Sequence, residues 1–493
     1  MVRHPPVSAP GRTSRAILVF RAGTDSACRR SPLPFQPWES NWTGEPSRAC
    51  ARPSPESSTS AATRAWEPRS PASTPPSGTT PDIVVGAATE ADVAAAVRFA
   101  REHRLPVRVQ ATGHGSESPV TGGMIVSTKR LDDLGIDPAT RLARIGAGVR
   151  WAPVVIAAAE HGLAPITGSS TSVGAVGYAL GGGLGPLARS HGFTSDWIRG
   201  FRVVTAEGEL TTADAATNAD LFWALRGGKG GLAIVTEMTL ELVPLRTLYG
   251  GSVFFEGGAI EPAFRAWIDW CAELPDEATT SVVFLTVPDV EGAPPPLRGR
   301  ELLSVRFAYP RGAADGERLF APMREAAPAF LDMVAEMPAS AVGTIHNDPE
   351  QGSPTWIRGF MLDTFDQEAG DAVLELAGPG SGSPFLAVEL RQIGGATATD
   401  TADGTAVGGR DSGYTLSTLA ADPSTFAEAA PARAAALEAA LRDRISAITN
   451  VNWVTDLSDR AAFERVWPST VSDRLAAARA AWDPERVFAF GPA

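Results

Sequence analysis

From Gly168 to Gly185 the chain reads GSSTSVGAVGYALGGGLG, and about one βα unit upstream it reads Ala111-Thr112-Gly113-His114-Gly115. Glycines let successive backbone N–H groups converge on a phosphate without obstruction from side chains. The hydroxyl-rich turn at 169–173 is typical of such a nest, and the glycines at 181–183 would let the chain pass close to a flat ring system. Together the two segments predict a pocket for a diphosphate-containing cofactor beside one histidine. The alternative is a glycine-rich surface loop, since short glycine patterns often match by accident.

Length and composition limit the classes of protein. The 493 residues exceed the roughly 250–300 that one hydrophobic core serves, so we expect two packed domains. A formal charge of −13 without basic patches argues against nucleic acid or a membrane surface as partner. Three cysteines without C-x-x-C spacing suggest neither a disulfide framework nor a zinc site, which favours a reducing cytoplasm. No run reaches the roughly 18 apolar residues of a membrane helix.

Apolar periodicity organises the chain. Residues 1–78 are rich in Pro, Ser, Thr and Arg and predict a disordered extension. A strand at 82–85 precedes Thr89-Glu90-Ala91-Asp92, which resembles a capping box, and the helix behind it runs to about His103. Strands at 107–109 and 124–126 complete a βαβ unit. After Pro244, strand-like runs alternate with alanine-rich helices, which predicts an antiparallel sheet backed by helices, and 394–413 is expected to be a flexible loop.

Other common sites are not indicated. No G-x-G-x-x-G lies between a strand and a helix, and no G-x-x-x-x-G-K-[ST] is present, which argues against a Rossmann nicotinamide site and against nucleoside triphosphate hydrolysis. The histidines have no metal-like spacing, so no metal site is predicted. His114 stands between glycines in a turn, where packing does not require it; a solvated turn histidine is the alternative.

Three motifs in order carry a resemblance to a known family: 111–115, 168–185, and Asn218 to Gly228, NADLFWALRGG. They resemble the flavin domain of the vanillyl-alcohol oxidase class and, within it, the bacterial berberine-bridge-enzyme-like oxidoreductases. The resemblance covers about 80–246 and continues at 389–395, ELRQIGG, and at the closing D-P-x-x-x-F of 483–488.

The resemblance implies an α+β fold: a two-subdomain PCMH-type FAD-binding domain plus a substrate domain with an antiparallel sheet backed by helices. We therefore expect an extension at 1–78, the FAD-binding domain at 79–246, the substrate-binding domain at 247–450, and a C-terminal segment at 451–493 that returns to the FAD domain.

In the family, the histidine at the position of His114 is bonded covalently to the flavin 8α-methyl group. A cysteine that can form a second bond corresponds to Ser170, so a single attachment and a less oxidising flavin are implied. Lys229 replaces a family glycine and is either a phosphate contact or an exposed turn lysine. The positions expected to contact FAD are Gln110, Ala111, Thr112, Gly113, His114, Gly115, Gly168, Ser169, Ser170, Thr171, Ser172, Val173, Gly174, Gly177, Tyr178, Gly182, Ile234 and Val235.

The catalytic base is the least determined part of the pattern. Relatives often use a tyrosine near an N-Y-x-N-Y-type segment, but this chain reads Asn450-Val451-Asn452-Trp453. Period-two alternation puts Glu389 and Arg391 on one face of a strand, as candidate base and substrate anchor; an exposed ion pair is the alternative. Gln392, Tyr414 and Trp453 are further candidates for the pocket wall.

The resulting hypothesis is an FAD-dependent oxidoreductase that removes a hydride from a small-molecule alcohol, amine or sugar-like substrate. Molecular oxygen or another acceptor would take the electrons, and neither nucleic acid nor membrane is an expected partner. Two alternatives remain. One is a flavin-binding protein that has lost turnover; the other is a nicotinamide-dependent reductase of the uridine-diphosphate-sugar type that shares the flavin domain.

Overall fold

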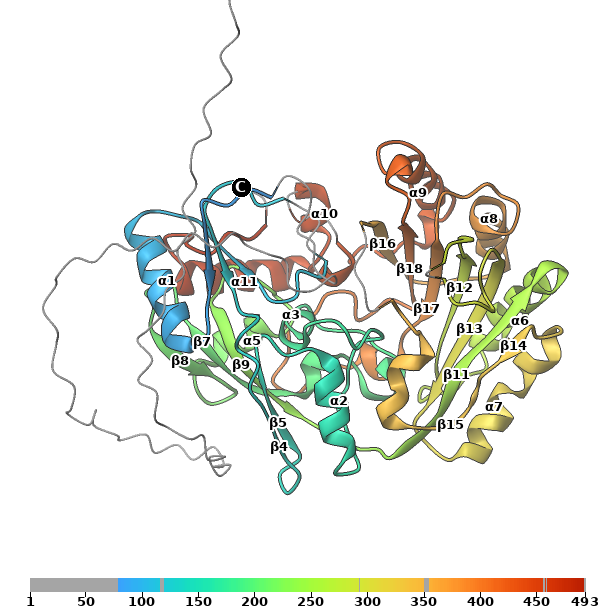
Figure 1. Cartoon of the computed structure of the whole chain (residues 1–493), viewed down its shortest axis with the longest axis horizontal. Helices are drawn as coiled ribbons and strands as arrows, with labels where there is room; N and C mark the ends of the chain where they lie inside the picture. The colour runs from blue at the N-terminus through green and yellow to red at the C-terminus, as the bar shows by residue number, and fades with distance from the viewer. Residues whose placement is uncertain are drawn as a thin grey trace, which may run out of the picture.

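The structure is a computed structural model, and it describes residues 79–115, 119–291, 293–349, 354–454, 457 and 459–491. The extension expected at 1–78 lies outside the described residues. Two groups of sheets lie side by side (Figure 1). We call 79–246, with the C-terminal residues packed on it, the first half, and the large sheet with its helices the second half.

A small parallel sheet opens the first half. It has the order β1-β3-β2, from Ile83–Gly86, Met124–Ser127 and Val107–Gln110, and both outer strands run parallel to β3. Helix α1 (Glu90–Glu102) connects β1 to β2 and begins with a capping box, in which Thr89 accepts from the N–H of Asp92 at 3.1 Å. The predicted βαβ unit and its capping box are confirmed.

A five-stranded antiparallel sheet completes the first half. Its order is β4-β5-β9-β7-β8, with bounds Leu134–Asp137, Leu142–Gly146, Ile234–Glu241, Ile198–Val204 and Leu210–Ala213. The core beside it takes in helices α2 (Trp151–Ala159), α3 (Ala175–Ala179) and α5 (Ala219–Leu225). Helix α4 (Ala188–His191) follows the glycine-rich segment.

The second half is one large antiparallel sheet covered by helices. The pair β6 (Leu163–Ala164) and β10 (Val243–Pro244) leads into it. The sheet has the order β14-β11-β13-β12-β17-β18-β16, and β15 also pairs with β11. The strands are β11 (Thr247–Glu256), β12 (Thr279–Thr286), β13 (Glu301–Tyr309), β14 (Leu331–Asp332), β15 (Ala335–Pro338), β16 (Trp356–Leu362), β17 (Ala387–Gln392) and β18 (Tyr414–Ala420).

Four helices lie against the outer face of this sheet: α6 (Ile260–Cys271), α7 (Ala313–Ala326), α8 (Gln367–Ala377) and α9 (Ala429–Ala440) (Figure 1). Their apolar side chains form one core with the strand residues that point toward the helices, among them Val388 and Leu390. The antiparallel sheet backed by helices is therefore confirmed, and its other face is turned toward the first half.

The prediction of a flexible loop at 394–413 is wrong, because this segment is packed against the first half. Thr397 and Ala406 are fully buried, and the N–H of Ala406 donates to the carbonyl of Arg226 at 2.8 Å. The guanidinium of Arg226 also donates to Asp403 at 2.7 Å. The glycines of this segment suggested flexibility, but in the structure they let the segment pack closely against the first half.

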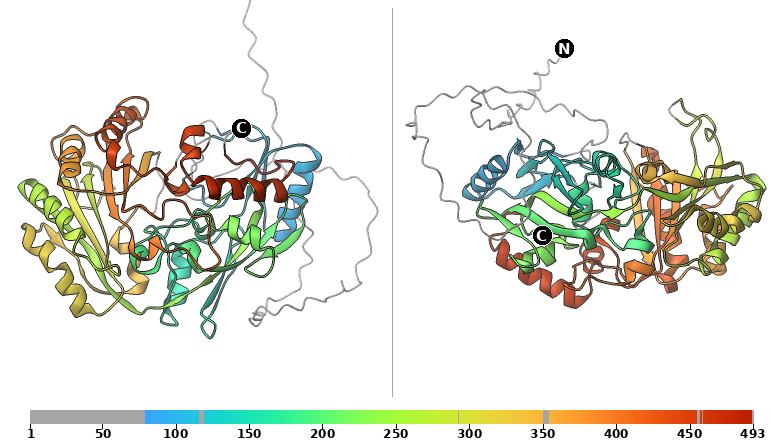
Figure 2. Two further views of the ribbon diagram at one scale, coloured as in Figure 1. Left: turned by 180° about the vertical axis from the view of Figure 1, so that it is seen from behind. Right: turned by 90° about the horizontal axis from the view of Figure 1, so that it is seen from below.

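The C-terminal residues lie against the first half (Figure 2). Helices α10 (Arg460–Glu464) and α11 (Ser469–Trp482) follow the large sheet, and Leu475 and Ala478 are buried in the core of the first half. Beyond α11, the N–H of Val107 donates to the carbonyl of Val487 at 2.7 Å. The Asp483 carboxylate accepts from the N–H groups of Val487 and Phe488, each at 2.7 Å, which explains the closing D-P-x-x-x-F pattern.

Among the described residues, no helix has the length and apolar character needed to cross a bilayer, and no group of His, Cys, Asp and Glu is arranged to hold a metal ion. The cytoplasmic location stays a prediction.

We expect Asp483→Ala to lower the free energy of unfolding by about 1–3 kcal/mol, because two buried N–H groups lose their acceptor. Urea denaturation of the purified protein measures this change. The matched control is Asp473→Ala, since Asp473 is exposed on α11 and forms no described hydrogen bond. Equal free energies of unfolding for the two variants would show that the Asp483 carboxylate does not hold the C-terminal segment in place.

Candidate functional site

His114 lies in the turn that follows β2 in the first half, and its residue is exposed to solvent. Desolvation by the surrounding protein lowers the pKa of its imidazole below 6.5. Asp348 opposes this shift, and the charges of Lys229 and Arg150 add to it. An added Cβ at the neighbouring Gly115, or at Gly177 on α3, would meet no atom within 4 Å, so no described side chain covers either glycine.

The hydroxyl-rich turn before α3 presents free backbone donors. Among the described residues, no acceptor is found for the N–H groups of Ser170, Thr171 and Ser172. The Ser170 and Ser172 hydroxyls bond to each other at 2.9 Å, and Arg150 fixes the turn by donating to the carbonyl of Ser172 at 2.9 Å. Adjacent unpaired N–H groups are suited to phosphate oxygens. The nest predicted from the sequence therefore has a counterpart in the structure.

The other predicted contacts near His114 come from the loop that follows β2 and from α3. Gly113 and Gly115 have φ of 81° and 70°, in the left-handed region that favours glycine, so the loop turns sharply on either side of the histidine. The side chain of Thr112 is buried and meets the space above Gly174, which holds Ala111 and Thr112 against the start of α3. Gln110 ends β2 beside them, with its carbonyl accepting from Thr128 at 3.0 Å.

The glycines at 181–183 approach protein rather than open space. An added Cβ at Gly181 would overlap the amide of Asn452, and one at Gly182 would lie 3.1 Å from Asn450 and 3.2 Å from Val407. Asn452 also donates to the carbonyl of Tyr178 at 3.0 Å. The side on which a Cβ would lie is thus covered by the C-terminal segment 450–453, and the expectation that Gly182 passes close to a flat ring stays a prediction.

Tyr178 and Gly168 are pressed together on the same turn. The space beside Gly168 is filled by the Tyr178 ring, which lies edge-on to Trp151 with centroids 6.2 Å apart. Burial raises the pKa of the Tyr178 phenol, so it stays protonated at neutral pH. Ser169 and Val173 complete the turn, with Val173 buried in the core of the first half.

A buried ionic network lies on the face of the second-half sheet that is turned toward the first half. Glu389 accepts from Arg306 at 2.7 Å, from Ser281 at 3.0 Å and from Arg391 at 3.0 Å. Arg391 also donates to the carbonyl of Leu184 at 3.1 Å, which ties the network to the glycine-rich segment. The period-two assignment of Glu389 and Arg391 to one face is confirmed, and the exposed ion pair is excluded, since their side chains are 17% and 5% exposed.

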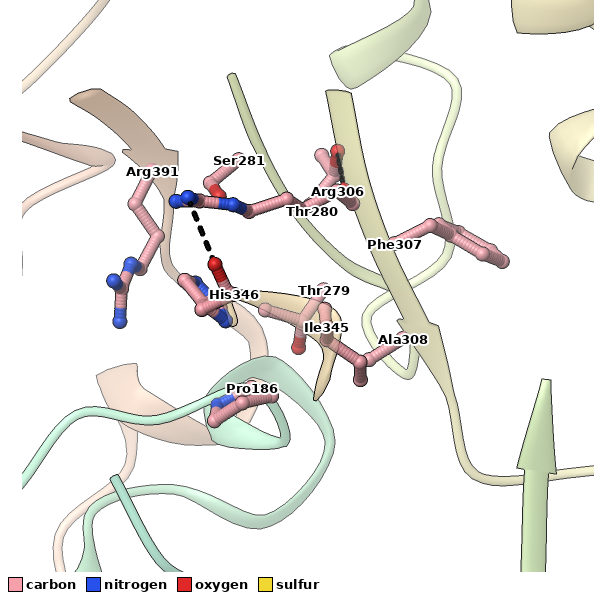
Figure 3. A pocket seen from close by; sticks show the side chains of 10 residues that line it. All are labelled: Pro186, Thr279, Thr280, Ser281, Arg306, Phe307, Ala308, Ile345, His346 and Arg391. Carbon is pink, nitrogen blue, oxygen red and sulfur yellow. Dashed lines mark hydrogen bonds between the residues drawn. The ribbon is translucent and has the colours of Figure 1, made fainter. Parts of the chain in front are cut away.

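His346 sits within this network and was not singled out in the sequence. Figure 3 shows His346 between Arg391 and Arg306, with the guanidinium of Arg306 donating to its carbonyl at 3.3 Å. The imidazole Nε2 lies 3.4 Å from the Glu389 carboxylate. Burial, together with Arg306, lowers the pKa of His346 to about 4, so the ring is neutral at physiological pH. Arg306 and His346 lack any local sequence signal, because strand pairing brings Arg306 to Glu389 and the fold of the segment after η3 (Ala339–Ile345) brings His346 there.

The electrostatics of Glu389 argue against a role as general base. Desolvation opposes ionisation, but the charge of Arg391, the His346 contact and the charge of Arg306 hold its pKa well below 4.5. A carboxylate so strongly stabilised as the anion is a weak proton acceptor. Glu389 is better suited to orient Arg391 and His346.

A cavity of about 180 Å³ lies where the two halves meet. Hydroxyl groups dominate its wall, together with one amide and one carboxylate. The lining residues are Ser170, Thr171, Ser172, Ser340, Ala341, Gly343, Thr344, Asn347 and Asp348. Asp348 is exposed, and its charge acts on both His114 and Arg391. The cavity thus brings the hydroxyl-rich turn of the first half beside residues 340–348 of the second half.

Two candidates for the pocket wall lie on the wrong face of the sheet. Gln392 donates to the carbonyl of Cys271 on α6 at 2.7 Å, and Tyr414 packs against Trp267 with ring centroids 6.4 Å apart. Both side chains therefore point into the helix layer. The prediction failed because successive side chains of a strand point to opposite faces of the sheet. Gln392 follows Arg391 directly, so it lies on the face opposite to Glu389 and Arg391.

Three further expectations need correction or refinement. The side chains of Ile234 and Val235 are buried in two separate apolar cores of the first half, so any contact with FAD would come from their backbone, and that contact stays a prediction. Trp453 packs in a small cluster at the junction of the two halves, where its indole N–H is buried and has no acceptor among the described residues. Trp453 thus remains a candidate at this junction.

Comparison with known proteins identifies the first half. Residues 81–214 match the family model described as "FAD binding domain". These residues form an FAD-binding domain. The (R)-6-hydroxynicotine oxidase of Paenarthrobacter nicotinovorans is 33% identical over 207 residues, which are 41% of this chain and 45% of that protein. The chain matches about half of the length of its curated relatives, 60% and 45% for two of them.

Solved structures extend the likeness to the whole fold. The 6-hydroxy-D-nicotine oxidase of Arthrobacter nicotinovorans superposes with a TM-score of 0.70 at 24% identity, covering 85% of this chain and 93% of that one. A variant of berberine bridge enzyme superposes with a TM-score of 0.71 at 18% identity, covering 85% and 92%. The chain therefore has the fold of the berberine-bridge-enzyme class, including the second half and the C-terminal return.

The residues present fit FAD. The unpaired N–H groups at Ser170–Ser172 suit its diphosphate, and the open space beside Gly115 and Gly177 leaves room next to His114. His114, neutral and accessible, is the nucleophile that covalent attachment would require.

We expect Glu389→Gln to lower the free energy of unfolding by about 3 kcal/mol at neutral pH, because two buried guanidinium groups lose their counter-charge. Since the folded-state pKa of Glu389 lies below its unfolded value, its stabilisation is present above pH about 4.5 and is lost as the pH falls through the folded pKa. The difference from wild type should therefore shrink on acidification. Urea denaturation at several pH values measures it.

Glu336→Gln is the matched control, since Glu336 is exposed on β15 and has no described ion pair. A Glu389→Gln variant as stable as this control at neutral pH would show that the network does not hold the sheet face together.

Proposed function

We propose that the protein is an FAD-dependent oxidoreductase whose flavin is attached covalently through His114. The observation that carries the proposal is the placement of His114, exposed and with a lowered imidazole pKa, between two glycines of the turn after β2, inside the residues that match the FAD-binding family model. When bound, FAD accepts a hydride from the substrate. The chain supplies the diphosphate nest at Ser170–Ser172, the nucleophile His114 and the polar cavity that opens toward the second half.

The substrate we propose is a small polar molecule with a C–H bond next to an amine or hydroxyl group. The cavity wall of hydroxyls, Asn347 and Asp348 supports this class, because it offers hydrogen bonds to hydroxyl groups and one carboxylate to a cationic amine. Structural neighbours include the 6-hydroxy-D-nicotine oxidase and a xylooligosaccharide oxidase in complex with xylobiose, which fall within this range. Molecular oxygen or another acceptor would reoxidise the flavin.

Arg391 is the residue we propose to meet the substrate from the second half. It is held by Glu389 on one side and by the carbonyl of Leu184 on the other, so its guanidinium has one preferred position. Glu389 and His346 act as positioning residues for it. Fixed orientation of a charged group before the reaction is a main contribution that a protein makes to catalysis.

We expect wild-type protein to keep its yellow flavin after acid precipitation, with a mass increase equal to that of FAD, and His114→Ala to release the flavin. Intact-mass measurement and the visible spectrum of the precipitate check this. His161→Ala is the matched control, because His161 is an exposed histidine in the same half. Release of flavin from the wild-type protein would show that the flavin is not covalently attached, and it would favour the nicotinamide-dependent reductase.

Turnover is tested separately from attachment. We expect one member of a panel of amines, alcohols and sugars to bleach the visible flavin band when mixed without oxygen, and the band to return when air is admitted. Bleaching by a nicotinamide donor instead would support the reductase. Bleaching by neither would support a flavin-binding protein that has lost turnover.

A further inference from the structure

Arg189 is a buried arginine of α4 whose side chain reaches out of the first half into the second. Its guanidinium donates to backbone carbonyls of the second half, those of Ile393 at 2.6 Å, Ala278 at 2.8 Å and Pro275 at 3.4 Å. Its own N–H donates to the Thr279 hydroxyl at 3.2 Å. One residue of the first half is therefore bonded to the start of β12 and to the end of β17.

Carbonyl oxygens, rather than an ion pair, hold this guanidinium in place. The Asp276 carboxylate lies 3.5 Å from Arg189 but is 77% exposed, whereas the Arg189 side chain is 6% exposed. An ion pair that is open to solvent on one side contributes little, while buried hydrogen bonds in several directions fix the position of the group.

Arg391 makes the reciprocal contact. It lies on β17 just before Ile393, and it donates to the carbonyl of Leu184, which lies just before Arg189 in the chain. Each half thus sends one buried arginine to a backbone carbonyl of the other half, and the two side chains cross the junction in opposite directions. Two such bonds, a few residues apart on both segments, fix the distance between β17 and the glycine-rich segment as well as their relative orientation.

The two glycines at the end of the ELRQIGG motif make room for Arg189. Gly394 and Gly395 have φ of 94° and 57°, in the region that favours glycine. A Cβ added at Gly395 would lie 2.5 Å from the carbonyl oxygen of Arg189, and one at Gly394 would lie 3.4 Å from its Nη1. These glycines therefore allow α4 to approach the end of β17 closely enough for the guanidinium to bond.

Little space separates the two halves beside this contact. Pro186 of the first half lies with Thr279, His346 and Arg391 around a cavity of about 10 Å³, which has room for about one water molecule (Figure 3). Packing this close transmits a displacement instead of absorbing it. A shift of α4 relative to the sheet would therefore also shift Arg391 relative to the first half.

We propose that Arg189 is a positioning residue that holds Arg391 in one place against the FAD-binding domain. The inference rests on the substrate contact proposed above for Arg391. A guanidinium carries several N–H donors in a rigid plane, so a single side chain can bond carbonyls on separate segments. A lysine ammonium at this position would keep the charge but would not reproduce that geometry.

The test uses purified full-length protein with its bound FAD and has two readouts. Hydrogen–deuterium exchange, followed by mass spectrometry, reports on the backbone of 181–187 and 387–395. The rate of flavin bleaching without oxygen is measured with the amine, alcohol or sugar that bleaches the wild-type flavin.

The variants are Arg189→Lys, Arg391→Met and the double variant. Arg189→Gln, which needs no buried counter-charge, replaces the lysine variant if that protein does not fold. Arg433→Lys is the matched control, because Arg433 on α9 also donates to two backbone carbonyls, at 2.7 and 3.3 Å, but both belong to the second half.

We expect Arg189→Lys to speed exchange in both segments and to slow bleaching about tenfold, since misplacing a reacting or binding group by about 1 Å can cost about 100-fold in rate. In the Arg391→Met background the same substitution should cause no further slowing, and Arg433→Lys should change neither readout.

An equal slowing of bleaching by Arg189→Lys in both backgrounds would show that Arg189 does not act through Arg391, and it would overturn the proposal. Unchanged exchange in 181–187 and 387–395 would overturn it as well. If no compound bleached the wild-type flavin, the proposed function would fail instead, and the exchange measurement alone would then decide whether Arg189 holds the two segments together.

Discussion

The absence of side chains at Gly181, Gly182, Gly183 and Gly185 is the constraint on which the rest of the structure depends. An added Cβ at Gly185 would overlap the carbonyl of Thr167, and one at Gly181 would overlap the amide of Asn452. Because the turn is bare, the C-terminal segment can seat on it and Arg391 can reach the carbonyl of Leu184. Parts of the chain more than 200 residues apart, Leu184 and Arg391, are thereby brought together. The FAD-binding domain and the second half thus share one junction.

Charge is distributed unevenly around that junction. Desolvation lowers the pKa of the His114 imidazole, with smaller contributions in the same sense from Lys229 and Arg150, while Asp348 in the cavity wall acts in the opposite sense. Across the junction, Glu389 is shared between Arg306 and Arg391. The junction therefore carries buried guanidinium groups on the second half and an exposed carboxylate, Asp348, in the cavity wall.

Local sequence predicted those features whose physics is local. The capping box at Thr89, the alternation of Glu389 and Arg391, and the turn around His114 depend on residues within a few positions of one another, and all three were found as expected. Predictions failed where packing across the chain decides. Gln392 turned into the helix layer, and the glycines of 394–413 proved to be packing positions rather than a loose loop.

By itself the sequence indicated a diphosphate-cofactor pocket and a helix-backed antiparallel sheet, because glycine spacing and apolar periodicity are properties of short segments. The resemblance of three ordered motifs to a known flavin domain implied that the cofactor is FAD. The tertiary structure alone decided which polar side chains meet. Arg306 and His346 join Glu389 through strand pairing and the residues after η3 (Ala339–Ile345), and Lys229 meets Asn452 across 223 positions. Contacts of this kind depend on the register of distant strands and on desolvation in the assembled fold, and neither is encoded in any local pattern.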